Sequence, residues 1–337
     1  MKAALFEKPG RLLVAQKALR ALKSDEVLVA VSACGICGTD LHIVEGQSHA
    51  RPPVVLGHEF TGRIADVGSE VRDFAVGDSV AVDPNISCGR CFYCRRGEPH
   101  LCEHLLALGV DIDGGMAEST IVPRGQLYKL PDGMKPETAA FIEPLSCVVH
   151  GIDRAGIRAG DRVVIVGGGT VGLLLLQLAV LSGASRTYVV EPVEWKRTLA
   201  EKLGAHETWD PKTTDVKQAI LDETTVGADV VIESAGLPGT VSLSLDLARR
   251  GGSVLLFGVC PFGMTVPLEP HRVYARELTI RGSFVNPFAF QQAVQLLAEK
   301  KVRIDDFVID RFPLDGVSEA FEALRSGKTI KSLIIPR

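Results

Sequence analysis

The stretch RVVIVGGGTVGLLLLQLAVL, residues 162–181, decides the fold of the second half of the chain. Its apolar start leads into Gly167-Gly168-Gly169-Thr170-Val171-Gly172, which fits the pattern G-x-G-x-x-G and opens a helix-like run. After a strand and before a helix, such glycines permit a tight turn and a close approach of the backbone to a pyrophosphate, and the helix N-terminus offers N–H groups to the phosphates. The stretch therefore predicts a dinucleotide-binding turn that includes Gly167, Gly169 and Gly172.

The acidic residue that follows this turn bears on the choice of nucleotide. The next apolar run, RTYVV, ends at Glu191, nineteen residues after Gly172. A carboxylate there accepts hydrogen bonds from both ribose hydroxyls and repels a 2′-phosphate, which favours NAD over NADP. Lys196 and Arg197 lie close by in the sequence and keep NADP open as an alternative. A domain of this kind that binds another nucleotide, or none, is a second alternative.

The pattern of apolar residues differs between the two halves of the chain. Up to about residue 145 it shows short apolar runs broken by Gly, Pro and Asp, which are typical of short strands in a barrel-like all-β unit. From Gly160 onward, β-rich runs alternate with helical patterns, which predicts βαβ units around a parallel sheet. Two amphipathic helical segments and the strand-like run SLIIP close the chain. The expected fold class is α/β, with a barrel-like domain and a doubly wound parallel-sheet domain.

Composition excludes several classes of protein. The 337 residues carry a net charge of −4, which argues against nucleic acid or an anionic membrane as partner. The charge-free stretch 163–181 holds four glycines, so it fits a strand, a turn and a buried helix better than a membrane span. The first twenty residues lack an apolar core of signal-peptide length. We therefore expect a cytoplasmic protein, in which the eight cysteines are metal ligands or buried thiols rather than disulfides.

Four of these cysteines are clustered in CGRCFYCRRGEPHLC, residues 88–102. Cys88, Cys91, Cys94 and Cys102 have a spacing that lets four thiolates converge on one tetrahedral ion. Four protein ligands leave no position for water or substrate, so the spacing predicts a structural zinc site. His100 or His104 could replace one cysteine, but four thiols make that unnecessary, and an iron–sulfur cluster is another alternative. A nucleic-acid-binding zinc ribbon is a further alternative, but the local charge is only weakly basic.

A second group of metal-ligand types lies earlier in the chain. Cys37, His58 and a carboxylate together would supply a thiolate, an imidazole and an oxygen ligand, with a fourth position left for water or substrate. That is the composition of a catalytic zinc site. From the residues alone, a buried thiol and a satisfied histidine remain the alternative.

Taken together, these motifs resemble those of the zinc-dependent medium-chain alcohol dehydrogenases. CGICGTDLH (34–42), GHEFTGRIADVG (57–68), the four-cysteine segment, EPLSC (143–147) and GGGTVG (167–172) occur in the family's order. Within the family, the chain looks closest to the polyol (sorbitol-like) and threonine dehydrogenases. The resemblance implies a GroES-like catalytic domain from residues 1–147 and 286–337, which carries the zinc lobe 88–102, and an inserted Rossmann domain from residues 148–285. It also suggests a homo-oligomer, a tetramer.

The resemblance also implies roles for individual residues. Cys37, His58 and Glu59 would bind the catalytic zinc, and Glu143 would lie near the metal or its water as a mobile carboxylate. Thr39 and His42 would form the proton relay. The cofactor contacts that the resemblance adds are Val171, Glu191, Lys196, Phe257, Gly258, Val259 and Val285. Lys196 stands where relatives usually carry Arg, and Val285-Asn286 stand where sorbitol dehydrogenases carry an Arg-Tyr pair. Sorbitol is therefore in doubt as the preferred substrate.

The expected reaction is reversible oxidation of a secondary alcohol to a ketone, with two zinc ions per chain and NAD. Zinc acts as a Lewis acid, the proton leaves through Thr39 and the cofactor ribose to His42, and the hydride passes to the nicotinamide. The predicted substrate is a short uncharged polyol or vicinal diol, with Val285 and Asn286 as an apolar and a neutral polar wall. The alternatives are L-threonine 3-dehydrogenase, for which His271 and Arg272 are candidate partners of the substrate carboxylate, and a non-catalytic NAD-binding regulator.

Overall fold

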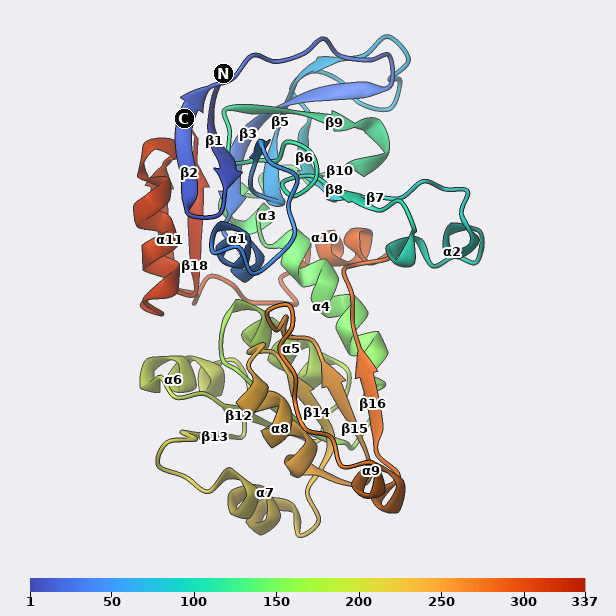
Figure 1. The fold of residues 1–337 in the computed structure, drawn as a ribbon, viewed down its shortest axis with the longest axis vertical. Helices are drawn as coiled ribbons and strands as arrows, with labels where there is room; N and C mark the ends of the chain where they lie inside the picture. Colours follow the sequence, from blue (N-terminus) through green and yellow to red (C-terminus); the bar gives the residue numbers. More distant parts are fainter. Residues whose placement is uncertain (337) are drawn as a thin grey trace. The chain divides into compact units, whose positions relative to one another are not determined.

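The computed structural model describes residues 1–336 and divides into two compact units. Unit 1 comprises Met1–Ser146 together with the segment from Val285 onward, and unit 2 comprises Cys147–Phe284. Helix α4 (Ile142–Ala155) carries the chain from the first unit into the second. Figure 1 shows the elements of each unit. None of the helices in the described residues is both long enough and apolar enough to cross a membrane.

Unit 1 is built on a seven-stranded sheet. Its order is β10 (Leu127–Lys129), β6 (Ser79–Val82), β5 (Glu59–Val67), β3 (Glu26–Gly35), β18 (Lys331–Ile335) and β17 (Ile309–Pro313), with β9 (Ser119–Pro123) also paired to β3. The C-terminal strand β18 runs antiparallel to β3, with Leu333 opposite Gly35. On the other side of β3, Gly35 lies opposite Glu59, the first residue of β5. Segments from three distant parts of the chain therefore meet at the end of β3.

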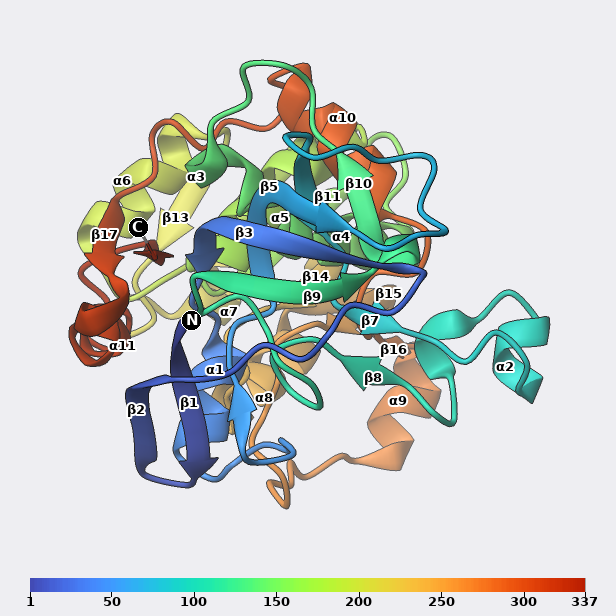
Figure 2. The same cartoon turned by 90° about the horizontal axis from the view of Figure 1, so that it is seen from above.

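The remaining elements of unit 1 surround this sheet. A small sheet contains β2 (Arg11–Gln16), β1 (Lys2–Lys8) and β4 (Val54–Val55), and a two-stranded ribbon contains β7 (Asn85–Ile86) and β8 (Leu106–Ala107). The helices are α1 (Gly38–Val44), α2 (Phe92–Arg95), α3 (Pro136–Ala139), α10 (Phe290–Ala298) and α11 (Val317–Arg325), with 3-10 turns η1 (Pro99–Leu101), η2 (Arg124–Gln126) and η3 (Leu314–Gly316). Both Figure 1 and Figure 2 show the lobe with α2 projecting away from the barrel strands.

Unit 2 contains a six-stranded parallel sheet, as its alternating pattern predicts. The order is β13 (Glu207–Trp209), β12 (Arg186–Val190), β11 (Arg162–Val166), β14 (Ala228–Glu233), β15 (Ala248–Leu256) and β16 (Thr279–Gly282). Its helices are α5 (Thr170–Leu181), α6 (Glu194–Lys202), α7 (Val216–Thr224), α8 (Pro238–Leu247) and α9 (Pro270–Arg276). The chain order reverses between β11 and β14, which creates the switch point at which α/β sheets bind ligands.

The charge-free stretch 163–181 folds as a strand, a glycine turn and a buried helix, as predicted. The strand is β11, and eight consecutive residues of α5, Gly172 to Ala179, are buried. A helix that is apolar all round is covered on all sides by protein, which explains its lack of charge. The α/β fold class is therefore confirmed, with a parallel-sheet domain and a domain made largely of short strands.

Candidate active site

The three residues of the predicted open site converge at the end of β3. One ligand atom each from Cys37, His58 and Glu59 lies within 4.8 Å of the others. Cys37 precedes α1, while His58 and Glu59 stand at the start of β5, and the pairing of Glu59 with Gly35 brings them to the cysteine. Both His58 and Glu59 are buried. A thiolate, an imidazole and a carboxylate in this arrangement fit a zinc ion and leave a position for an exogenous oxygen.

Asp40 lies against the histidine of this set, and the sequence analysis did not single it out. Its buried carboxylate accepts a hydrogen bond from the backbone N–H of Cys37 at 2.9 Å through Oδ2, and Oδ1 lies 3.5 Å from Nδ1 of His58. Burial alone lowers the pKa of His58, but the negative charge of Asp40 outweighs it and the net pKa is raised well above its usual value. Because Nδ1 faces Asp40, Nε2 is the nitrogen left to face an ion. In metal-bound histidines, one ring nitrogen usually binds the metal and the other faces a carboxylate or carbonyl.

A buried lysine also belongs to the site. Lys331, on β18, is 2% exposed and forms an ion pair with Oε2 of Glu59, so Oε1 is the carboxylate oxygen left to face an ion. Burial lowers the pKa of Lys331, but Glu59 outweighs this effect and raises it above the ordinary value. A Cβ atom at Gly35 would collide with both the Glu59 carboxylate and the Lys331 side chain. Glycine at this position therefore makes room for the ion pair.

Glu143 lies near these residues but outside the close set. It stands in the first turn of α4 and is buried. Burial raises the pKa of its carboxyl to about 7; positive His58 works against the increase and negative Glu59 adds to it. Its carboxylate is not among the three groups within 4.8 Å, so the structure places it as a neighbour of the site that can take up or release a proton near neutral pH.

Asn286 belongs to a buried chain of hydrogen bonds that is connected to Glu143 through Ser146. Its Nδ2 donates to Oγ of Ser146 at 2.8 Å and lies 3.5 Å from Oδ1 of Asp83, and its Oδ1 accepts from Nδ2 of Asn85 at 2.8 Å. Ser146 in turn donates to the backbone carbonyl of Glu143 at 2.6 Å. Burial raises the pKa of Asp83 to about 6. The expectation that Asn286 offers a free polar wall to the substrate is wrong, because both ends of its amide are already bonded.

The two predicted relay residues share one short helix. The hydroxyl oxygen of Thr39 lies 3.7 Å from Sγ of Cys37, and His42 follows one turn later on α1. Residues three apart on a helix lie on the same face. Nδ1 of His42 is buried and has no hydrogen-bond partner among the described residues.

The four clustered cysteines converge as a second set. Their sulfur atoms all lie within 4.8 Å of one another, with Cys91 3.5 Å from Cys94 and 3.8 Å from Cys102. These separations are too long for disulfides, and all four thiols are free. The pKa of Cys91 is lowered to about 6 because the backbone N–H groups of Cys94 and Glu103 point at its sulfur. Four sulfur donors around one point fit a tetrahedral ion with no open position.

In unit 2, the glycine turn and Glu191 lie together at the carboxyl end of β11. Gly167 has φ +113°, and a Cβ at Gly172 would collide with the carbonyl of Gly167. Oε2 of Glu191 accepts from the N–H of Gly168 at 2.8 Å, and Oε1 accepts from the N–H of Val193 at 3.0 Å. The carboxylate therefore shapes the turn, and its contact with a ribose stays a prediction.

The basic residues after Glu191 already have contacts inside unit 2. Arg197 donates to the carbonyl of Glu191 at 2.9 Å and lies 3.7 Å from Asp210, while Nζ of Lys196 lies over the ring of Trp195 at 5.6 Å. Arg272, a candidate partner for a substrate carboxylate, pairs instead with Asp246 and donates to the carbonyl of Leu245. That suggested role of Arg272 is not supported.

Glu233 is the buried anchor of the loops that follow β14 and β15, and sequence reasoning missed it. Its side chain is fully buried, and Oε1 accepts from the N–H groups of Ala235 and Gly236 at 2.9 Å and from the hydroxyl of Thr240 at 2.6 Å. Its backbone carbonyl accepts from the N–H groups of Phe257 and Gly258, both at 2.9 Å. The predicted contacts Phe257, Gly258 and Val259 thus start a loop whose first residues are held by Glu233. Val285, the remaining predicted contact, opens the second segment of unit 1 with φ +46°.

Comparison with known proteins gives consistent matches over nearly the whole chain. Residues 23–132 match the family described as alcohol dehydrogenase GroES-like domain, and residues 170–299 match zinc-binding dehydrogenase. The chain is 34% identical over 340 residues to D-arabinitol dehydrogenase 1 of Uromyces fabae, covering 100% of this chain and 97% of the relative. It is 37% identical over 314 residues to L-threonine 3-dehydrogenase of Pyrococcus horikoshii, covering 91% and 90%. A solved structure of a candidate zinc-binding dehydrogenase from Sinorhizobium meliloti 1021, bound to NADP, has a TM-score of 0.95 and 44% identity, with 99% of both chains covered.

Proposed function

The chain belongs to the zinc-dependent medium-chain alcohol dehydrogenases, and we propose that its substrate is a short uncharged polyol or vicinal diol oxidised at a secondary carbon. Members of this family oxidise secondary alcohols to ketones reversibly with a nicotinamide cofactor, and this enzyme does the same. The relative from Uromyces fabae is named for a five-carbon polyol, which supports the proposal.

The single observation that carries the substrate proposal is the charge around the open site. Glu59 and Glu143 are two buried carboxylates beside it, and the positive charge of Lys331 is already compensated by Glu59. A polyol hydroxyl that neighbours the reacting one can donate a hydrogen bond to the carboxylate of Glu143, since Glu59 is engaged by Lys331 and by the ion. Lys331 cannot attract a substrate carboxylate, because Glu59 already compensates its positive charge. The carboxylates of the site would therefore repel such a substrate.

When bound, zinc supplies a Lewis acid that lowers the pKa of the substrate hydroxyl, and the nicotinamide supplies the hydride acceptor. The chain contributes the ligand set Cys37, His58 and Glu59, which Asp40 and Lys331 hold in place. We propose that Thr39, which lies beside Cys37, accepts the proton from the substrate hydroxyl and that His42, one turn later, passes it to solvent. Glu143, with a pKa of about 7, can hold or release a proton next to the same position.

L-Threonine 3-dehydrogenase is the second candidate function. It is favoured by the 37% identity to the Pyrococcus horikoshii enzyme of that name. The two functions separate in a panel of xylitol, arabinitol, sorbitol, 2,3-butanediol, ethanol and L-threonine, measured as kcat/KM by NADH absorbance. We expect a polyol or diol to lead. A tenfold lead for L-threonine, about 1.4 kcal/mol of transition-state preference, overturns the polyol proposal.

For the cofactors, we propose NAD and two zinc ions per chain, one in each cysteine-containing set. The position of Glu191 supports NAD, whereas the NADP bound to the Sinorhizobium meliloti relative keeps NADP in the test. Glu191→Ser should shift the ratio of kcat/KM for NADP over NAD upward by one to two orders of magnitude, since charge-assisted hydrogen bonds contribute roughly 1.5–3 kcal/mol each. Glu194→Ser, an exposed acidic residue three positions later, is the control and should leave the ratio unchanged.

For assembly and location, we propose a homo-tetramer in the cytoplasm. An oligomer is supported by exposed apolar side chains between β15 and α9, where Phe262, Met264 and Leu268 are 80%, 51% and 51% exposed. A reducing compartment is supported by the eight free cysteines. Light scattering coupled to gel filtration measures the oligomeric state directly, and a monomeric mass contradicts the proposed oligomer.

A further inference from the structure

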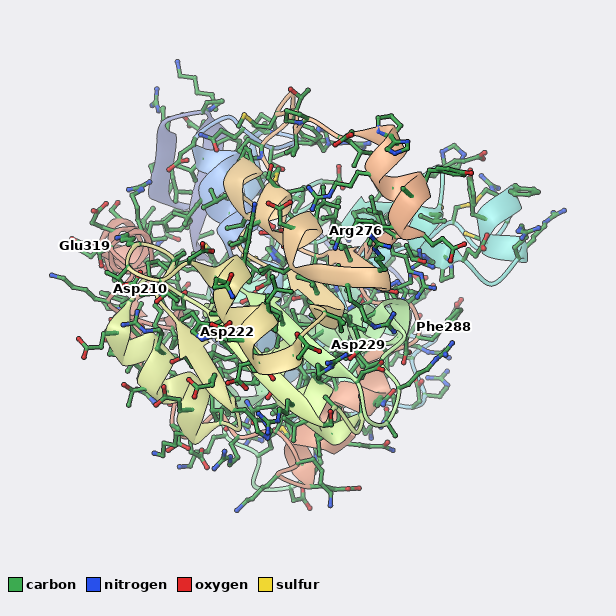
Figure 3. The ribbon with its side chains drawn as sticks, turned by 90° about the horizontal axis from the view of Figure 1, so that it is seen from below. Asp210, Asp222, Asp229, Arg276, Phe288 and Glu319 are labelled. Atoms are coloured by element: carbon green, nitrogen blue, oxygen red, sulfur yellow. The ribbon has the colours of Figure 1, made fainter. Side chains whose placement is uncertain are left out.

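A cavity of about 290 Å³ lies in unit 2 at the amino-terminal edge of the parallel sheet. Its lining comes from α7, from α9, and from the residues that lead into β14 and β15. The glycine turn follows β11 at the carboxyl ends of the strands, so the cavity lies at the opposite edge of the sheet from the predicted cofactor contacts. Figure 1 shows α7 and α9 at the lower end of unit 2, and Figure 3 labels Asp222 of α7 and Arg276 of α9 in the view from below.

The ionic lining of this cavity is predominantly positive. Lys217, Arg272 and Arg276 face a single carboxylate, that of Asp246, so three positive charges minus one negative charge leave two uncompensated. Asp246 forms ion pairs with both Lys217 and Arg272. Arg276 donates to the carbonyl of Ala248, and among the described residues no carboxylate pairs with it.

The surroundings of Arg276 favour an added negative charge. Burial lowers the pKa of Arg276, and the positive charges of Arg272 and Arg250 lower it further, while the negative charge of Asp246 offsets part of this decrease. A second, more open hollow of about 470 Å³ shares Arg276 and adds Arg250 and Tyr274 to the lining. An anion beside Arg276 would relieve the repulsion between these cations, which is an electrostatic gain that water does not provide.

The other walls of the cavity are apolar. This apolar lining consists of Ile220 and Leu221 of α7 together with Val226 and Leu247. Leu221 and Val226 are 41% and 53% exposed, so a ligand that covers them removes apolar surface from water. The volume is at the lower end of the range for small-molecule sites.

We propose that this cavity binds a small organic anion, with a carboxylate or phosphate group held by Arg276 and Lys217 and a short apolar body against Ile220, Leu221 and Val226. No residue of the cavity belongs to the alcohol-oxidising site, so the site is a separate one and does not depend on the substrate proposal. Its ligand is an effector of unit 2 rather than a reactant.

Calorimetry on the zinc-loaded enzyme tests this, with saturating NAD to fill the pyrophosphate-binding turn. Acetate, butyrate and hexanoate are titrated at constant ionic strength, and butyl phosphate is compared with hexanoate to distinguish the two head groups. We expect saturable binding that tightens about fourfold for each methylene that reaches the apolar walls. No heat of binding, or equal affinity for all three carboxylates, overturns the proposal.

Variants separate this site from unspecific anion binding. Arg276→Gln should weaken hexanoate at least tenfold through loss of a charge-assisted hydrogen bond. Because Arg276 also bonds Ala248, Lys217→Gln is the second variant; its side chain is 56% exposed but pairs with Asp246, so its Tm is compared with that of the parent enzyme. It should weaken hexanoate several-fold. The control is Arg325→Gln in unit 1, a similarly exposed arginine paired with Glu322, which should leave affinity unchanged. Equal weakening by Arg325→Gln, or none by either cavity variant, contradicts the proposal.

Discussion

The four-cysteine lobe and the Cys37–His58–Glu59 site lie in the same unit, yet they are built from different parts of the fold. Within residues 88–102, Cys91 and Cys102 are the only buried residues, and Phe92 is 63% exposed. The lobe therefore has no apolar core, and its regular elements are α2 of four residues and η1 of three. The proposed ion at the centre of the four sulfur atoms would take the place of a core.

The open site, in contrast, is held by the sheet and by buried partners of its own. Glu59 is paired with Lys331, and Asp40 bonds the backbone of Cys37 while facing His58. These contacts exist in the polypeptide alone, so the site keeps its shape without an ion. Metal removal should therefore unfold the four-cysteine lobe and only inactivate the Cys37–His58–Glu59 site.

The largest expected effect is at the closed site. Cys91→Ser removes one of four ligands, and structural zinc in comparable small sites contributes on the order of 10 kcal/mol to folding. The lobe should lose its structure, so trypsin should cut after its exposed Arg90, Arg95 and Arg96. Mass spectrometry of a timed digest measures this. Cys260→Ser, a cysteine outside both sets, is the control and should resist trypsin like the parent enzyme.

The next effect is on activity rather than on folding. Cys37→Ser should lower kcat/KM by at least three orders of magnitude, about 4 kcal/mol, because the Lewis acid is lost or misplaced. The Tm should stay within about 2 °C, since the Glu59–Lys331 pair and the sheet remain. Metal analysis should find one zinc ion left per chain. If Cys37→Ser unfolded the enzyme while Cys91→Ser only inactivated it, the assignment of the two sites would be reversed.

The two sites also differ in how far the sequence predicts them. The cysteine lobe and the glycine turn can be predicted because their ligands or glycines are close in the sequence and their spacing alone fixes the chemistry. The partners that support the open site cannot be predicted in this way. Lys331 reaches Glu59 only because β18 pairs with β3, and nothing in the run IKSLIIP marks this lysine as buried. Asn286 was expected to face the substrate, but it is turned into a hydrogen-bond chain that depends on contacts with Asn85 and Ser146, far away in the sequence.

An intermediate effect concerns pH in the enzyme stripped of its open-site ion. The carboxyl of Glu143 has a pKa of about 7 in the folded chain against 4.5 ordinarily. The folded state therefore holds the proton more tightly than the unfolded state does. This contribution to stability is fully present below about pH 4.5 and is lost as the pH rises through 7, by up to about 3 kcal/mol. Glu143→Gln should remove that part of the slope in urea unfolding between pH 5 and 7.

The control for this experiment is Glu45→Gln, since Glu45 is a carboxylate on the surface of the same unit. It should leave the slope as in the parent enzyme. Asp83, whose pKa is raised to about 6, adds a smaller slope of the same sign that both variants keep. A parent slope that survives in Glu143→Gln means that Glu143 is not the group that titrates.

The smallest expected effect tests whether the support of the open site extends behind Glu143. Ser146→Ala removes a hydroxyl that donates to the carbonyl of Glu143 and accepts from Asn286, so it should cost about 1–2 kcal/mol and leave an amide N–H of Asn286 poorly satisfied. A Glu143 that is less well held should also lower kcat a few-fold at nearly constant KM. Ser244→Ala is the matched control, because Ser244 is equally buried and bonds a carbonyl one turn back in α8 of unit 2. If both variants lose the same stability and neither loses kcat, Ser146 only satisfies nearby backbone and amide groups and does not position Glu143. The residues that support the open site would then be Lys331 and Asp40 alone.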